Sequence, residues 1–343
     1  MLTVRSLSLL ALGLLSAVEA APQNRNKASK KKGGQQQATT AFQQAQQIPQ
    51  GISTATDGSS ILDTTVMVNG LPLRFKVSAP ADQFTAASGV TGGAQAANAT
   101  GTLGLNVLLH GDGGQSFFDF PNQAVQDGLV GVAVLAPDPN LFWGGGSGLD
   151  RTDGVAHSQA VADLIAGVVP QVLAFDAAKV SFTGVSGGSL LLSGFLMPGH
   201  MAQFASAGQT SQVLLNCGGL TPQVDVSAAN AAALAATRVH FQSTQQELAL
   251  LQPAIPEAIQ AYEQIATGQG LDAAAVGALQ TVDNSPNGGH CEFDEKDFVS
   301  GVQLMADSFS AVVQGGNGIL AGTDVDVLNP VPGNENLKFS GAS

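Results

Sequence analysis

Charged side chains are scarce in this sequence. Only 11% of its 343 residues are Asp, Glu, Lys or Arg, which is about half the share of an average soluble protein. Hydrophobic residues nevertheless make up 44% of the chain, and 42 residues are glycine. Such a composition excludes a polyelectrolyte and an intrinsically disordered protein. The length is sufficient for a domain that buries a real hydrophobic core.

Basic residues are few and unevenly placed. Residues 1–50 hold six of the thirteen Lys and Arg residues but only one of the 26 acidic residues. The remainder of the chain is therefore strongly acidic, and a surface of that sign repels phosphate backbones. Because the run Lys30-Lys31-Lys32 is too small to reverse this balance, we expect no nucleic-acid partner.

Several chemical signatures are missing as well. No segment reaches 18 uninterrupted apolar residues, so a membrane span is not expected. The histidines and cysteines lack the close pairing of metal sites, and no glycine-rich nucleotide motif opens a strand–helix unit. We therefore expect neither a metal nor an organic cofactor.

Residues 1–20 have the three parts of a secretory signal peptide. Arg5 supplies the positive start, residues 9–15 form a short apolar core, and residues 18–20 form a small-residue cleavage site. The sequence thus predicts a secreted, extracellular protein.

Residues 21–50 are rich in Gln, Ala and Lys and have almost no large apolar groups. They predict a disordered low-complexity tail, or a propeptide that is cut near Lys32. Further along the chain, the sequon Asn98-Ala99-Thr100 predicts a glycoprotein.

The rest of the chain predicts a single α/β domain over residues 51–343. Two β-branched runs, 61–68 and 71–77, flank Asn69-Gly70, which is a strong signal for an antiparallel hairpin. Further strands are predicted at 103–109, 130–135, 180–183, 213–216, 239–242 and 279–282, and helices at 155–175, 247–265 and 298–313. Because strands alternate with helices, we expect a mostly parallel central sheet of about eight strands with helices on both faces. Pro170 is expected to kink the first of these helices.

The segment Gly184-Val185-Ser186-Gly187-Gly188 is the only Gly-x-Ser-x-Gly in the chain. A β-branched strand precedes it and an apolar helical stretch, 190–196, follows it, as a nucleophile elbow requires. Ser186 is therefore a candidate nucleophile. An unreactive serine in a glycine turn would produce the same pattern.

Three stretches together resemble the α/β-hydrolase superfamily, in particular secreted serine esterases of the polyhydroxyalkanoate depolymerase and feruloyl esterase type. Residues 107–114 (VLLHGDGG) look like a strand followed by a His-Gly oxyanion loop. Residues 175–188 are similar to the family's nucleophile elbow, and residues 287–290 (NGGH) resemble the turn that carries the catalytic base. The resemblance implies an α/β-hydrolase fold with a catalytic triad.

A serine nucleophile needs a histidine that accepts its proton and a carboxylate that orients the histidine. Of the five histidines, His290 is the best candidate, since it follows the last predicted strand in a glycine turn. His157, His200 and His240 lie in ordinary helix, loop or strand patterns.

The orienting acid has three candidates, because the sequence departs here from the family pattern. The family places an Asp after the strand that corresponds to 239–242, but Gln246 occupies that place and Glu247 follows it. Glu247 is the first candidate, with Asp225 and Asp283 as alternatives. A helix N-terminal acid, favoured by the helix dipole, would also explain Glu247.

Backbone N–H groups should bind the oxyanion that develops during the reaction. The resemblance implies Gly187 as one donor and Asp112 or Gly113 as the other. His110 is expected to order this loop or to contact the substrate. An Asp side chain beside an oxyanion is unfavourable unless it turns away.

Two further features bear on the site. Trp143 lies in a glycine-rich stretch after the strand at 130–135, where it predicts either an aromatic wall for the substrate or a packed loop anchor. Cys217 and Cys291 follow strands expected to end at the same edge of the sheet, so we expect a disulfide that braces His290. Two free buried thiols are the alternative.

These residues predict a monomeric, secreted serine hydrolase that cleaves small or polymeric carboxylic esters through a Ser186 acyl-enzyme. A peptidase or a thioesterase could use the same triad. A non-catalytic secreted binding protein on the same fold is the alternative from another class.

Overall fold

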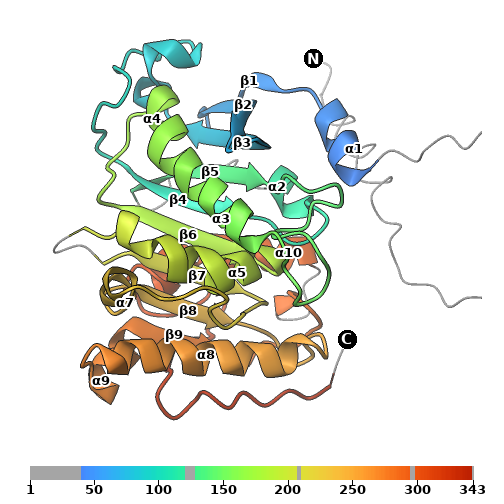
Figure 1. Cartoon of the computed structure of the whole chain (residues 1–343), viewed down its shortest axis with the longest axis vertical. Coiled ribbons are helices and arrows are strands. Elements are labelled where there is room, and N and C mark those ends of the chain that lie inside the picture. Colours follow the sequence, from blue (N-terminus) through green and yellow to red (C-terminus); the bar gives the residue numbers. More distant parts are fainter. Residues whose placement is uncertain (1–39, 120–127, 207–209, 294–297, 342–343) are drawn as a thin grey trace, which may run out of the picture. The chain divides into compact units, whose positions relative to one another are not determined.

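The computed structural model describes residues 40–119, 128–206, 210–293 and 298–341 (Figure 1). The expected signal peptide at 1–20 and the cleavage site near Lys32 lie outside these residues. The described strands are β1 (Gly51–Thr54), β2 (Ser60–Val68), β3 (Leu71–Ala79), β4 (Gly104–Leu109), β5 (Leu129–Leu135), β6 (Val180–Val185), β7 (Gln212–Asn216), β8 (Arg238–Gln242), β9 (Gln280–Asp283) and β10 (Asn329–Pro330). They form one sheet in the order β1-β2-β3-β5-β4-β6-β7-β8-β9-β10.

The sheet confirms the predicted architecture. The strands β5, β4, β6, β7, β8 and β9 are parallel neighbours, whereas β2 and β3 form the antiparallel hairpin with Val68 opposite Leu71. Asn69 and Gly70 between them both have positive φ, as a tight hairpin turn needs. The eight predicted strands correspond to β2–β9. β1 and β10 are additional edge strands that the sequence did not reveal, because they are short and fully exposed and lack an alternating apolar pattern.

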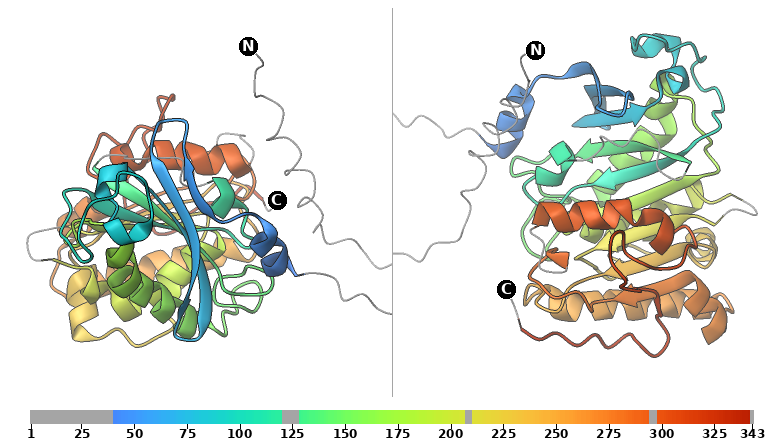
Figure 2. Two further views of the ribbon diagram at one scale, coloured as in Figure 1. Left: turned by 90° about the horizontal axis from the view of Figure 1, so that it is seen from above. Right: turned by 180° about the vertical axis from the view of Figure 1, so that it is seen from behind.

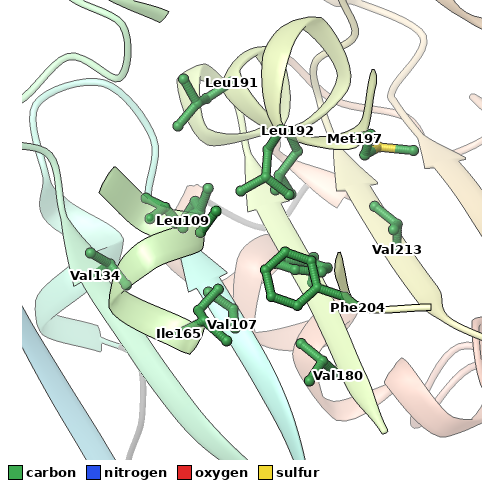
Figure 3. Close-up of a cluster of buried hydrophobic side chains, with 14 of the residues drawn as sticks. Val107, Leu109, Val134, Ile165, Val180, Leu191, Leu192, Met197, Phe204 and Val213 are labelled. Carbon is green, nitrogen blue, oxygen red and sulfur yellow. The ribbon is translucent and has the colours of Figure 1, made fainter. Parts of the chain in front are cut away.

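Helices cover both faces of the sheet, because side chains alternate along each strand. Val107 and Leu109 of β4 pack into a large apolar cluster, whereas Leu108 between them packs on the opposite face (Figure 3). The helices are α1 (Ala41–Gln47), α2 (Gln115–Asp119), α3 (Gly154–Asp163), α4 (Val169–Val172), α5 (Gly187–Leu191), α6 (Met197–His200), α7 (Ala228–Leu234), α8 (Leu251–Gly268), α9 (Ala273–Leu279), α10 (Phe298–Asp307) and α11 (Phe309–Val312). Helices α3, α5 and α8 lie on the face in front in Figure 1, and the view from behind in Figure 2 shows α10 on the other.

Proline shapes the helices as expected. The predicted helix 155–175 consists of α3, a π-helical turn (Leu164–Val168) and α4, with Pro170 in the first turn of α4. A second π-helical turn (Leu192–Leu196) precedes Pro198 in the first turn of α6. Proline cannot donate a backbone hydrogen bond and clashes with the preceding turn, so a widened turn accommodates it.

Two predicted boundaries were wrong. The segment expected to be disordered up to residue 50 contains α1, which begins at a Thr40 capping box. The carbonyl of Ala45 in this helix accepts a hydrogen bond from buried Arg74 in β3. A contact so distant in sequence leaves no local signal. The helix predicted from residue 247 begins only at Leu251, so Glu247 lies in the turn before it.

Two surface predictions can be placed on the described residues. Among these residues, no helix has both the length and the apolar character needed to cross a bilayer. Asn98 of the sequon is exposed, and its side-chain oxygen accepts a hydrogen bond from Gln171. Glycosylation of Asn98 stays a prediction.

Candidate active site

Ser186 occupies a strained turn between β6 and α5. Its φ of 49° and ψ of −114° are unfavourable for a residue with a side chain. A Cβ at Gly184 would lie 2.7 Å from the Cα of Ser189, and one at Gly188 would overlap the carbonyl of Leu109. Both glycines are therefore required for the close approach of strand and helix, and the turn leaves Ser186 partly exposed.

The turn lies at a topological switch point of the sheet, where the order of the strands reverses. The chain passes from β4 to β5 on one side and then places β6 on the other side of β4. β4 and β6 are neighbours, but the connections that follow them lead to opposite sides of the sheet. In open α/β sheets, ligands bind at the carboxyl edge at such a point. This places the loop 110–114 beside Ser186.

Ser186, His290 and Glu247 form a hydrogen-bonded chain. The Nε2 of His290 lies 2.8 Å from Ser186 Oγ, and its Nδ1 lies 2.5 Å from Glu247 Oε1. Because the carboxylate can only accept, Nδ1 carries the proton and Nε2 is free to accept the serine proton. The side chain of His290 is 17% exposed and that of Glu247 is fully buried. His290 can thus be reached from solvent, whereas Glu247 cannot.

The position of Glu247 follows from two loops that are joined by hydrogen bonds. The backbone N–H groups of Gln245 and Gln246 donate to the carbonyls of Pro286 and Gly288, at 2.9 and 3.1 Å. This pairing turns Gln246 outward and Glu247 inward. The acid therefore occurs one residue later than the family pattern implies.

Further bonds hold the Glu247 carboxylate in place. Ser243 Oγ donates to Oε2 at 3.1 Å, and the backbone N–H of Leu248 donates to Oε1 at 2.7 Å. Thr244 Oγ1 donates to the carbonyl of Gly289, next to His290, at 2.8 Å. Glu247 is not a helix N-terminal acid, because the following helix begins at Leu251.

The two alternative acids lie elsewhere. Asp225 is exposed. Asp283 is buried, and its carboxylate accepts hydrogen bonds from Gln242 Nε2 at 2.9 Å and from the backbone N–H of Ser285 at 3.2 Å. His290 is hydrogen-bonded to Glu247 instead.

The two cysteines form the disulfide Cys217–Cys291, with their Cα atoms 5.4 Å apart. Cys291 follows His290, and Cys217 follows Asn216, whose carbonyl accepts the Ser186 N–H at 2.9 Å. The Asn216 side chain also donates to the carbonyl of Gly184 at 3.1 Å. The bridge therefore links the segment that holds the elbow to the turn that carries the histidine.

One group of metal-ligand atoms occurs among the described residues. Cys217, Cys291 and His290 place their sulfur and nitrogen atoms close together. Both sulfurs are bonded to each other, so they offer no thiolate to a metal.

Two backbone N–H groups in the segments around Ser186 have no acceptor among the described residues. Gly187 lies in the first turn of α5, where N–H groups have no partner within the helix. In the loop after β4, Gly113 N–H donates to the carbonyl of Leu141 at 3.2 Å and Gly114 N–H donates to that of Gly111 at 3.0 Å. Among the described residues no acceptor is found for the N–H of Asp112. The N–H groups of Gly187 and Asp112 are therefore available to a ligand, whereas that of Gly113 is already engaged.

The side chain of Asp112 is held by Arg151. The two carboxylate oxygens accept hydrogen bonds from the two terminal guanidinium nitrogens of Arg151 at 2.9 and 2.8 Å. The carboxylate lies so close to α5 that a Cβ at residue 187 would overlap it. Sequence reasoning missed Arg151, although it is the only Lys or Arg between Lys76 and Lys179.

His110 and Trp143 do not contact the reaction site as substrate-binding residues would. His110 is fully buried, donates from Nδ1 to the carbonyl of Gly111 at 2.6 Å, and accepts at Nε2 from Ala136 N–H at 2.9 Å. Burial lowers the pKa of His110 to about 4, so the ring is neutral. Trp143 is also fully buried, with its ring between those of His110 and His157 at 5.3 and 6.2 Å. Both side chains fix loops, because the glycine-rich turn after Trp143 folds the indole inward.

Phe298 is the aromatic residue that borders the site. Its ring centre lies 6.3 Å from that of His290, and its Cζ would be 3.3 Å from a Cβ at Gly111. Sequence reasoning missed Phe298. The sequence predicted the helix that contains this residue, but not which face of the helix borders the site.

No protein-family profile and no curated protein matches this sequence. Among solved structures, the chain is similar to a thermostable esterase at a TM-score of 0.46 and 14% identity, over 72% of this chain and 61% of the length of that esterase. It is similar to fungal esterases from Rhizomucor miehei at 0.44 and 13%, over 80% and 85% of the two chains. The values for acyl-protein thioesterase 2 from Zea mays are 0.41 and 14%, over 61% and 96%.

The fold follows from the chain's own geometry. The strained Gly-x-Ser-x-Gly turn joins a strand to a helix at the carboxyl edge of the sheet. The acid and the histidine follow later in the chain, in the order Ser, Glu, His. A mixed, mainly parallel sheet with this elbow and this order has the α/β-hydrolase fold.

Proposed function

We propose that this protein is a serine hydrolase that cleaves carboxylic esters through an acyl-enzyme on Ser186. The observation that carries the proposal is the continuous hydrogen-bonded chain from buried Glu247 through His290 to partly exposed Ser186. A binding protein without catalytic activity has no use for a strained serine beside a correctly oriented imidazole.

The geometry supports a two-step reaction. Ser186 Oγ attacks the ester carbonyl carbon while His290 Nε2 takes the serine proton. The carbonyl oxygen becomes an oxyanion that accepts hydrogen bonds from the N–H groups of Gly187 and Asp112. When the intermediate collapses, the C–O bond to the alcohol breaks and His290 returns the proton to the departing oxygen. Water then attacks the acyl-enzyme by the same steps and releases the acid.

Glu247 supports the proton transfers of this reaction. Glu247 stabilises the imidazolium that forms when His290 is protonated, and it keeps Nδ1 protonated beforehand.

The ester class is preferred over amides and thioesters because of the sequence stretches that resemble secreted esterases. Secretion after removal of residues 1–20, and a monomeric state, belong to the same proposal.

A fluorophosphonate probe tests the proposal directly, because it phosphonylates only activated serines. We expect the wild-type protein to be labelled and to hydrolyse members of a panel of p-nitrophenyl esters. Ser186→Ala should abolish both, whereas Ser53→Ala, in the exposed edge strand β1, should change neither. Labelling that survives Ser186→Ala, or no labelling of the wild type, would refute the proposal. Faster cleavage of peptide amides or thioesters would reassign the substrate class.

A further inference from the structure

We propose that Arg151 is a positioning residue of the oxyanion hole, and this inference rests on the proposed function. Arg151 holds the carboxylate of Asp112 against α5, which directs the Asp112 N–H toward the oxyanion. It also compensates a negative charge that would otherwise oppose the oxyanion.

The contact between Arg151 and Asp112 has the geometry of a clamp. Both terminal nitrogens of the guanidinium bind the carboxylate, and such paired bonds fix orientation as well as distance. The guanidinium also donates to the carbonyl of Trp143 at 3.0 Å. Because its side chain is only 2% exposed, Arg151 has little freedom to move. The fixed side chain in turn restricts the position of the Asp112 backbone.

The charge of Asp112 makes this clamp necessary. Its carboxylate lies against Gly187, the other proposed oxyanion donor, so a negative group stands beside both donors. An unpaired carboxylate there would repel the negative charge that grows on the substrate oxygen. Arg151 is the cation that the described residues pair with this carboxylate. The expected conflict between Asp112 and an oxyanion is therefore removed by pairing, not by turning the side chain away.

The molecule offers a matched control for purely structural effects. Arg74 and Asp63 form a second bidentate pair, with Arg74 fully buried and Asp63 12% exposed. This pair joins β2 and β3 and takes no part in the proposed site. Breaking either pair leaves a buried charge and lowers stability, but only the Arg151 pair should affect catalysis selectively.

The experiment compares kcat and KM for ester hydrolysis in folded variants, with Trp143 emission as a probe of the same loop. We expect Arg151→Met to lower kcat about 100-fold, with KM within about threefold, since one oxyanion donor is commonly worth 10²–10³. Asp112→Asn should lower kcat less, because it leaves a cation and not an anion beside the oxyanion. The double variant Asp112→Asn/Arg151→Met should recover about tenfold relative to Arg151→Met.

The outcomes separate this inference from the proposed function. A wild-type protein that neither labels nor hydrolyses esters overturns both. An active wild type whose Arg151→Met variant keeps kcat within threefold, or whose double variant recovers nothing, overturns the role of Arg151 alone. The same holds if Arg74→Met/Asp63→Asn, folded at the assay temperature, lowers kcat as much as Arg151→Met. If Arg151→Met does not fold, Arg151→Lys decides, because lysine retains the charge but cannot make the paired bonds. A lowered kcat then supports the positioning role, and a kcat within threefold of the wild type overturns it.

Discussion

The two sides of Ser186 are held by different physical means. The base side comprises the loops 243–247 and 285–291, which are joined by backbone hydrogen bonds and anchored by the disulfide. The oxyanion side comprises the loops 110–114 and 141–151, which are joined by the partly buried Asp112–Arg151 ion pair and by buried neutral rings. Each side presents one carboxylate to the site.

The difference shows how one chemical group takes two roles. The carboxylate of Glu247 is hydrogen-bonded to the imidazole of His290, and in the proposed reaction it stabilises the positive charge that appears on that ring. The carboxylate of Asp112 is already paired with a cation and contributes position instead of charge. On the base side, we therefore expect activity and stability to depend on the Glu247 carboxylate and on the disulfide. We expect the oxyanion side to be sensitive to low pH and to added side-chain volume.

The largest effect is expected from removing the charge of the acid on the base side. Glu247→Gln should lower kcat about 10⁴-fold with little change in KM, because the imidazolium loses its counter-charge and the tautomer is no longer fixed. Steady-state ester hydrolysis measures this loss. Asp225→Asn, which changes an exposed acid, is the control and should retain full activity. A Glu247→Gln enzyme with a tenth of the wild-type kcat would show that another group orients His290.

Removal of the disulfide should have the next largest effect, on stability. The two cysteines are 74 residues apart in the chain. Removing a disulfide that closes a loop of that size lowers the free energy of unfolding by about 4 kcal/mol. Denaturant unfolding of Cys217→Ser/Cys291→Ser checks the value. Under native conditions this variant should lose activity while the emission of Trp143, on the oxyanion side, stays unchanged. A shifted Trp143 spectrum would mean that the two sides are not independent.

Acid should destabilise the protein through its buried histidines. Burial lowers the pKa of His110 and of His240 to about 4, compared with about 6.5 in the unfolded chain. The folded state therefore favours the neutral rings, and their contribution is complete above pH 6.5 and is lost as the pH falls toward 4. Each ring should account for about 3 kcal/mol over that range.

The control for the acid effect is His240→Gln, which removes one of the two titrations. Unfolding free energies between pH 7 and pH 4 should fall less steeply in this variant than in the wild type. Equal slopes would show that His240 does not contribute to the acid sensitivity.

A steric change at the boundary of the two sides is expected to have the smallest effect. In Gly187→Ala the new methyl group must displace the Asp112 carboxylate, so kcat should fall about 100-fold while the backbone donor of residue 187 is retained. Kinetic assays of the purified variant check this. Gly167→Ala, on an open helical surface, should leave kcat unchanged. A Gly187→Ala enzyme as active as the wild type would place the carboxylate away from the site.

Local patterns predicted much of the fold and the position of the serine. Ser186 could be identified because a strained turn between strand and helix needs glycines at fixed places, and Gly184 and Gly188 satisfy contacts that exclude any side chain. Glu247 was one candidate among three, since its inward direction depends on how Gln245 and Gln246 pair with a loop about 40 residues later. For His110 and Trp143 the sequence left both a substrate contact and a loop-anchoring role open, and their complete burial favours the loop-anchoring role.

By itself, the sequence determined the order of strands and helices, the hairpin, the elbow and the pair of cysteines. These features follow from periodicity, from turn residues and from backbone conformations that only certain residues adopt. Only the tertiary structure decided which acid meets His290, which N–H of the oxyanion loop is left without an acceptor, and that Arg151 compensates Asp112. Those choices depend on contacts between segments 28 or more residues apart, and the free energy of such contacts exists only after the sheet has brought the loops together.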